Sequence, residues 1–265
     1  MSVQGYWADL KAPEFASLPE DLVAVLPIGA TEQHGPHLPV SVDTDLITGV
    51  AARMLTALDP AQNVLVLPAL TVTKSGEHDR FPGTLSLTAE TLMAVLRDIG
   101  ASLARAGVRR LVLFNGHGGN TAVLEIIARD LRIAHDMIVV HASWFGFADY
   151  EGVIDQASLA HDIHAGDSET SPMLALKPHL VDMGKAEDFR PAMEGWADTH
   201  PQIGLSGQPA RPGWIIGDLS DSGACGNAAA ATAEKGQALL DSAGKGFAAF
   251  LANFARFDHR KAQDD

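Results

Sequence analysis

The feature that most constrains this chain is an alternation of short apolar runs with longer segments of helical spacing. The apolar runs cover residues 22–28, 63–67, 110–114 and 137–141, and helix-type segments lie between them at 46–58, 88–106 and 120–133. Strands that are apolar throughout are typical of a parallel sheet that is buried on both faces. The pattern therefore predicts an α/β fold with a mostly parallel central sheet and helices on both sides.

The rest of the chain adds loops and a terminal helix to this core. Residues 185–225 are irregular and hold several Pro, Gly and Trp residues, so we expect loops over the core, with a lid as one interpretation. Residues 228–257 have the composition of a terminal helix, and residues 258–265 that of a frayed tail. No repeat or linker divides the 265 residues, which predicts a single domain over residues 1–265.

Charge and composition limit the partners of the chain. A net charge of −14 repels nucleic acid and anionic membranes, so we expect neither as a partner. No signal-peptide pattern and no apolar run of transmembrane length is visible, which predicts a soluble, cytoplasmic protein. The single cysteine, Cys225, allows no internal disulfide, and we interpret it as a small buried or loop residue rather than a nucleophile.

Three segments concentrate the residue types that bind metal ions. They are residues 32–37 with Asp43 and Asp45 downstream, residues 115–120, and residues 161–171. Carboxylate and imidazole groups are ligands of Zn²⁺ and Mn²⁺, and the two oxygens of an aspartate can bridge two cations. A solvated polar turn explains any one segment. Three of them near predicted strand ends, where such folds carry their active sites, favour a metal centre.

Individual residues of these segments suggest individual roles. Glu32 and His34 alternate in an extended loop, so both side chains can face the same way. His117 follows a strand, and the backbone at Gly118 and Gly119 can approach a substrate oxygen closely.

The sequence restricts the roles of two further histidines and a glutamate less closely. His164 is the best general acid/base, because imidazole titrates near neutrality. Glu169 is either a ligand or only a partner of a helix dipole, while Asp167, Ser168 and Thr170 suit a helix cap. His78 either contacts the substrate or belongs to a salt-bridged turn.

The same residues resemble the creatininase (creatinine amidohydrolase) family in order and spacing. The resemblance covers about residues 20 to 180 and rests on residues 29–39, Asp43, residues 81–84, residues 115–120 and residues 169–171, with residues 231–236 similar to the closing helix of the family. It implies a three-layer α/β/α sandwich, usually as a homohexamer, with a dinuclear site for Zn and/or Mn, and Fe as a further choice. The implied reaction hydrolyses the C–N bond of a cyclic or linear amide.

The resemblance also implies a role for each site residue. One metal ion is expected on Glu32, His117 and a bridging Asp43, and the other on His34, Asp43 and Glu169. His164 matches the catalytic histidine of the family, and His78, Gly118 and Gly119 are expected to bind a small amide substrate.

Two departures concern the substrate. Creatinine amidohydrolases carry a tyrosine and a glutamate where this chain has Gly118 and Gly119, and a tryptophan where it has Ala160. The Gly-Gly form and residues 75–78 are more similar to the mycofactocin-precursor peptidases and formamidopyrimidine-type deformylases. A substrate other than creatinine (a ureide or lactam, a formamide or a small peptide) therefore stays open.

Two other functions compete with the amidohydrolase. A metal- or ligand-binding protein without catalysis would keep the ligands and lack an acid/base group, against which His164 argues. A metallophosphoesterase would need basic residues near the site, and the site segments offer only Lys74 and Arg80.

Overall fold

A five-stranded parallel sheet forms the centre of the molecule. The computed structural model describes residues 2–205 and 207–259. The strands are β1 (Gln4–Tyr6), β2 (Val23–Ile28), β3 (Val64–Val66), β4 (Arg110–Asn115) and β5 (Ile138–Ser143), in the order β1-β3-β2-β4-β5. Every neighbouring pair is parallel, which confirms the predicted sheet type.

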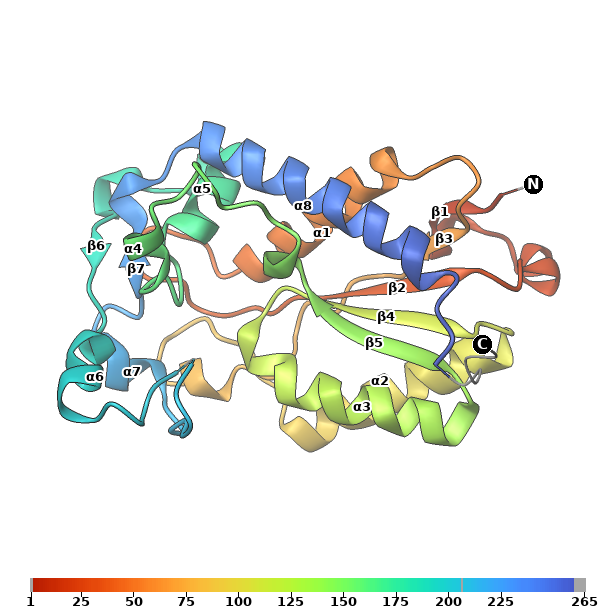
Figure 1. The fold of residues 1–265 in the computed structure, drawn as a ribbon, viewed down its shortest axis with the longest axis horizontal. Helices are drawn as coiled ribbons and strands as arrows, with labels where there is room; N and C mark the ends of the chain where they lie inside the picture. Colours follow the sequence, from red (N-terminus) through yellow and green to blue (C-terminus); the bar gives the residue numbers. More distant parts are fainter. Residues whose placement is uncertain (1, 206, 260–265) are drawn as a thin grey trace, which may run out of the picture.

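Helices cover both faces of this sheet (Figure 1). The helices α1 (Val42–Ala57), α5 (Asp167–Leu176) and α8 (Ala233–Phe254) pack on one face, and α2 (Ala89–Arg105) and α3 (Thr121–His135) on the other. Alternate strand residues supply the two cores, because successive side chains of a strand point to opposite faces. Val23 and Val112 join the core under α1 and α8, whereas Ala24 and Leu111 join the core under α2 and α3. The three-layer α/β/α prediction is confirmed.

Several boundaries differ from the sequence-based prediction. Helix α1 begins four residues before the predicted start at Leu46, so Asp43 lies in its first turn. Helix α8 begins only at Ala233, because residues Ala228–Ala230 form a separate 3₁₀ turn and the Thr232 side chain caps the helix. The cap predicted from Asp167, Ser168 and Thr170 is wrong: Gly166 holds the N-cap position, and those three residues lie inside α5. Strand β1, short and containing a glycine, was not predicted.

Residues 185–225 form short elements rather than one long loop. They include β6 (Asp188–Phe189), which pairs with β7 (Gly226–Asn227), and the one-turn helices α6 (Trp196–Thr199) and α7 (Ile216–Leu219); a third one-turn helix, α4 (Gln156–Leu159), precedes them. A small apolar cluster of Leu205, Ile216, Leu219 and Cys225 lies beneath them. Cys225 is buried, as predicted.

The described residues bear only in part on the predicted tail and on the predicted absence of a transmembrane segment. Most of the predicted tail, residues 260–265, lies outside them. Within residues 2–205 and 207–259, no helix is long and apolar enough to cross a membrane.

Candidate metal centre

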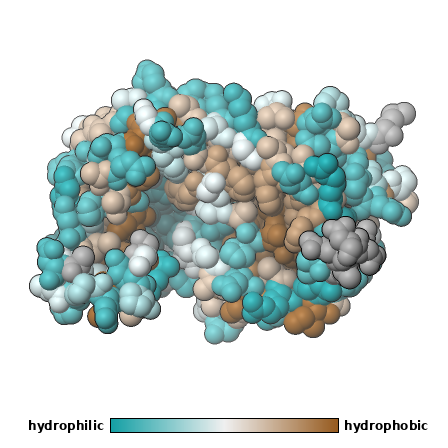
Figure 2. Space-filling view, viewed as in Figure 1, coloured by the Kyte–Doolittle hydropathy of each residue, from teal (hydrophilic) through white to brown (hydrophobic). Residues whose placement is uncertain are grey.

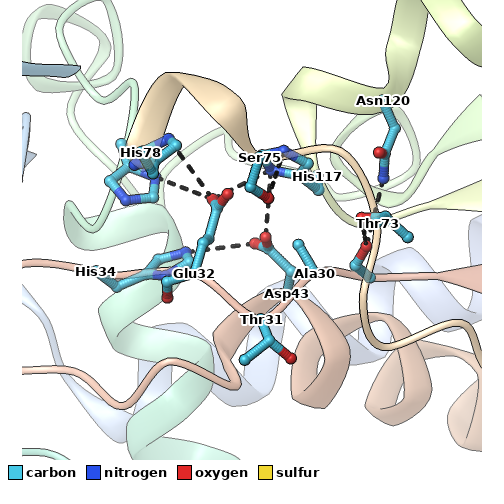
Figure 3. A network of polar contacts seen from close by, with 12 residues as sticks. Ala30, Thr31, Glu32, His34, Asp43, Thr73, Ser75, His78, His117 and Asn120 are labelled. Atoms are coloured by element: carbon cyan, nitrogen blue, oxygen red, sulfur yellow. Dashed lines mark hydrogen bonds and ion pairs between the residues drawn. The ribbon is translucent and has the colours of Figure 1, made fainter. Parts of the chain in front are cut away.

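The predicted metal-ligand side chains converge from four parts of the chain, and Figure 3 shows Glu32, His34, Asp43 and His117 among them. Glu32 and His34 lie in the loop after β2, and Asp43 in the first turn of α1. His117 follows β4, and Glu169 lies in the first turn of α5. Strands β2 and β4 are parallel neighbours, so the loops at their carboxyl ends lie side by side. All five side chains are buried.

Asp43 lies between two histidines and presents a different oxygen to each. Its Oδ1 is 3.3 Å from His34 Nε2, and its Oδ2 is 3.3 Å from His117 Nδ1. Glu32 Oε1 is 3.1 Å from His117 Nδ1, and Glu169 Oε2 is 3.8 Å from His34 Nε2. Two groups that could hold a metal ion, Glu32–Asp43–His117 and His34–Asp43–Glu169, share Asp43, and a third group of this kind consists of Glu32, His34 and His164.

These separations suit a divalent cation at the centre of each group. Ligands held at about 2.0–2.2 Å around a tetrahedral Zn²⁺ lie roughly 3.3 Å from one another. Three buried atoms that face the centre, Glu32 Oε2, His34 Nε2 and Asp43 Oδ2, have no hydrogen-bond partner. Buried polar atoms are almost always paired, so this concentration of unpaired acceptors and an imidazole nitrogen fits cation binding.

Backbone carbonyls orient both histidines of the cluster. The Nδ1–H of His34 donates to the carbonyl oxygen of Glu32 at 3.0 Å, which leaves the lone pair of Nε2 facing Asp43 and Glu169. The Nε2–H of His117 donates to the carbonyl oxygen of Lys74 at 2.9 Å, which leaves the lone pair of Nδ1 facing Glu32 and Asp43. Such hydrogen bonds set the tautomer that a metal-binding histidine needs.

The electrostatics of the cluster favour positive charge at its centre. Burial would lower the pKa of His34, but the carboxylates of Asp43, Glu169 and Glu32 together outweigh burial and raise that pKa to about 9. Burial raises the pKa of Glu169 to about 7, with the neighbouring His34 opposing the shift. Three crowded carboxylates therefore attract cations, and two divalent ions supply more positive charge than protons on the two imidazoles.

Two further histidines lie beside the cluster but in different surroundings. Burial lowers the pKa of His78 and lowers the pKa of His164 well below its ordinary value, so both rings are neutral at neutral pH. Each places a ring nitrogen 3.8 Å from Glu32 Oε1. His78 lies in the 3₁₀ turn Gly76–His78, and His164 in a loop bridged to Cys225.

A pocket of about 560 Å³ opens onto this cluster. Glu32, His117 and His164 line it, as do the predicted substrate-binding residues His78, Gly118 and Gly119. Figure 2 shows this face of the molecule hollowed between the region of α6 and α7 and the layers of the sheet.

Further residues line the pocket or contact its histidines, and among them Arg211 and Gln33 had no role assigned from the sequence. Lys74 and Glu77 form an ion pair on one wall, with the Lys74 Nζ 2.5 Å from Glu77 Oε2. Residues 211–214, which include Arg211 and Trp214, form another wall from within the irregular region. Gln33, between two predicted ligands, contacts both His78 and His164. Only the position of Gln33 in the 32–37 segment could have signalled its role.

Comparison with known sequences relates most of the chain to one family. The model of the creatininase family, described as creatinine amidohydrolase, matches residues 8–251. Creatinine amidohydrolase of Pseudomonas putida is 38% identical over 244 residues, which are 86% of this chain and 88% of that protein. The mycofactocin precursor peptide peptidase of Mycobacterium tuberculosis is 35% identical over 223 residues, 82% of this chain and 79% of that protein.

Solved structures of similar fold belong to the same group. A mutant creatininase of the Zn–Zn type is 31% identical, with a TM-score of 0.73 over 97% of this chain and 100% of that chain. A structure described as creatininase Mn is 32% identical, with a TM-score of 0.71 over the same shares of the two chains.

Proposed function

Because the chain belongs to the creatininase family, we propose that it is a metal-dependent amidohydrolase that hydrolyses the C–N bond of a cyclic or linear amide. One observation carries this proposal. Asp43 presents one oxygen to His34 and the other to His117, with a glutamate completing each group. A shared carboxylate of this kind can bridge the two ions of a two-metal centre.

The proposed ligands follow from the two groups. Glu32, His117 and Asp43 would hold one ion, and His34, Asp43 and Glu169 the other. The resemblance to a Zn–Zn creatininase and a Mn creatininase supports Zn²⁺ or Mn²⁺ as the ions. When bound, such ions polarise an amide carbonyl and lower the pKa of water.

The chain's own residues account for the remaining steps. His164 is neutral and lines the pocket, so its ring nitrogen Nδ1, which lies beside Glu32, can accept a proton from the attacking water. This nitrogen can then give the proton to the departing amide nitrogen. Attack, proton transfer and C–N cleavage yield an acid and an amine. The walls of the pocket, formed by residues 74–78 and 211–214, orient the substrate and limit access of solvent.

The pocket bears on the size of the substrate. Gly118 and Gly119 contribute no side chains, and the volume of about 560 Å³ lies in the range of small-molecule sites. Relatives named creatinine amidohydrolase and mycofactocin precursor peptide peptidase bracket the substrates to test.

A hydrolysis screen with metal-loaded protein tests the proposal. Creatinine, hydantoin, N-formylated amines and short peptides would each be assayed with Zn²⁺ or Mn²⁺ and again after chelation. We expect turnover of at least one class that disappears on chelation and returns with metal. His164→Ala should abolish it while metal content stays unchanged. A fully metal-loaded protein that turns over none of these classes would favour the alternative of non-catalytic ligand binding.

A further inference from the structure

The side chain of Gln33 is buried between His78 and His164, the two histidines beside the proposed metal ligands. Its Nε2 lies 2.8 Å from His78 Nδ1 and 2.8 Å from the carbonyl oxygen of Gly223. Its Oε1 accepts a hydrogen bond from the backbone N–H of Gly35 at 2.9 Å. All hydrogen-bonding atoms of this amide are therefore occupied.

Two backbone groups fix which way the amide points. The N–H of Gly35 can only donate, and the carbonyl of Gly223 can only accept. A reversed amide would set oxygen against oxygen at Gly223 and N–H against N–H at Gly35. The Gln33 Nε2 therefore points toward His78, and its second hydrogen is donated to His78 Nδ1.

This contact determines the tautomer of His78. Because Nδ1 accepts a hydrogen bond, the ring hydrogen of the neutral imidazole lies on Nε2. That nitrogen is 3.8 Å from Glu32 Oε1, and His78 lines the pocket. His78 thus presents an N–H donor at the reaction site.

His164 presents a hydrogen-bond acceptor to the site, whereas His78 presents a donor. Its Nε2–H donates to the backbone carbonyl oxygen of Gln33 at 2.7 Å, so the lone pair lies on Nδ1, which is 3.8 Å from Glu32 Oε1. The approach of Gln33 Nε2 to His164 Nε2 at 3.3 Å is a packing contact, because both nitrogens direct their hydrogens elsewhere.

We propose that Gln33 is a positioning residue that makes His78 a hydrogen-bond donor and His164 a proton acceptor on the two sides of the bound amide. The proposal rests on the proposed function. His78 Nε2–H would donate to the amide carbonyl oxygen as charge develops there. His164 Nδ1 would take the proton of the attacking water and give it to the leaving nitrogen as the C–N bond breaks. The side chain of Gln33 acts on His78, and its backbone carbonyl acts on His164.

Neutron diffraction from crystals of the zinc-loaded protein tests the assigned hydrogens directly. We expect deuterium on Nε2 and none on Nδ1 in both His78 and His164. Deuterium on His78 Nδ1 would overturn the proposal. This readout does not depend on turnover, so a protein with the expected tautomers and no hydrolase activity would reject the proposed function alone.

A double-mutant cycle tests the coupling in solution with the substrate found in the screen. Gln33→Leu leaves the backbone carbonyl that holds His164 and removes the side-chain amide, which donates to His78 and Gly223 and accepts from Gly35. Loss of one oxyanion donor typically lowers kcat about 10²–10³-fold, and we expect such a loss for Gln33→Leu and for His78→Phe at unchanged zinc content. The double variant should be no slower than either single variant, because the two residues act as one unit. Losses that multiply would contradict the proposal.

Discussion

Gly118 and Gly119 are neighbours on the wall of the pocket, yet their surroundings differ. A Cβ atom built on Gly119 would lie 1.9 Å from Glu77 Oε1 and 2.4 Å from His117 Nε2, whereas one on Gly118 would meet nothing within 4 Å. Glu77, from the 3₁₀ turn Gly76–His78, thus occupies the space that a side chain at position 119 would need. A glutamate at position 119, the residue that the sequence analysis attributes to creatinine amidohydrolases, would clash with the observed side chain of Glu77.

Gly119→Ala should therefore weaken metal binding, and Gly118→Ala should not. The new methyl group must displace the imidazole of His117, which the Lys74 carbonyl holds toward Glu32 and Asp43. Disturbing the partners of a metal-bound histidine typically costs about 10–100-fold in metal affinity. Competition with a zinc chelator measures the difference. Equal affinities in the two variants would contradict the proposed role of His117.

Asp162 predicts a pH dependence of stability. Burial raises the pKa of its carboxyl to about 7, against the effect of hydrogen bonds from Ser168. The folded protein therefore prefers the protonated form, so the carboxyl costs no stability below its ordinary pKa of 3.8 and costs more as the pH rises toward 7. Each unit of pKa shift corresponds to about 1.4 kcal/mol.

Asp162→Asn removes the titrating carboxyl, so the variant is compared with the wild type at each pH. We expect the variant to gain free energy of unfolding relative to the wild type as the pH rises from about 4 to about 7. Above that range the gain should stay constant. Urea denaturation of both proteins at saturating zinc and several pH values measures the difference. A difference that does not change with pH would show that the carboxyl is not protonated in the folded protein.

At the scale of elements, helices deliver two of the proposed ligands. Because α1 begins at Val42, Asp43 lies in its first turn and faces both histidines, rather than in a preceding loop. Glu169 occupies the first turn of α5. The position of α5 in turn depends on α8, since Gly236 of α8 packs directly against the backbone of Ser171.

Gly236→Ala should destabilise the protein, although alanine normally favours a helix. The added Cβ would lie 1.9 Å from the carbonyl oxygen of Ser171, so the backbones of α5 and α8 must move apart. Overpacking of this kind typically costs about 1–3 kcal/mol. The exposed Lys245, on the same helix, offers a matched control, and Lys245→Ala should change the free energy of unfolding by at most about 0.5 kcal/mol. Chemical denaturation distinguishes the two.

At the scale of the whole molecule, the proposed metal centre would join loops at the carboxyl ends of the strands to helices on one face of the sheet. It links the loop after β2, the loop after β4, and helices α1 and α5. Cations that bind these residues only in the folded state should stabilise the entire fold. The homohexamer implied by the family resemblance stays a prediction.

Removal of metal should therefore lower the Tm of the full chain. Binding at one hundred times the Kd contributes about 2.7 kcal/mol, and a domain of this size shifts by about 2–4 °C per kcal/mol. We expect a Tm that falls by at least 5 °C or so on chelation and rises with added zinc. Calorimetry of Asp43→Asn, which should lose most of this dependence, provides the control. A Tm independent of zinc would contradict a buried metal centre.

Much of the architecture was accessible from the sequence because its signals are local. The apolar runs at residues 22–28 and 110–114 identify buried strands, since periodicity over a few residues determines which faces are covered. The residue types at Glu32, His34 and His117 likewise indicate metal chemistry wherever they lie. Strand β1 carries no such pattern, because three residues with a central glycine are too short to show one.

Only the tertiary structure decided how those residues meet. Gln33 contacts Gly223, 190 residues away along the chain, and this hydrogen bond, together with the one from Gly35, orients the amide that contacts His78. Arg211 and Trp214 reach the pocket from an irregular region without periodicity. Contacts between residues so distant in the chain depend on strand order and helix packing, which local patterns do not specify. The sequence by itself determined the parallel sheet and the metal-binding residue types. The packing of the layers decided which backbone groups contact the Gln33 amide and which residues line the pocket.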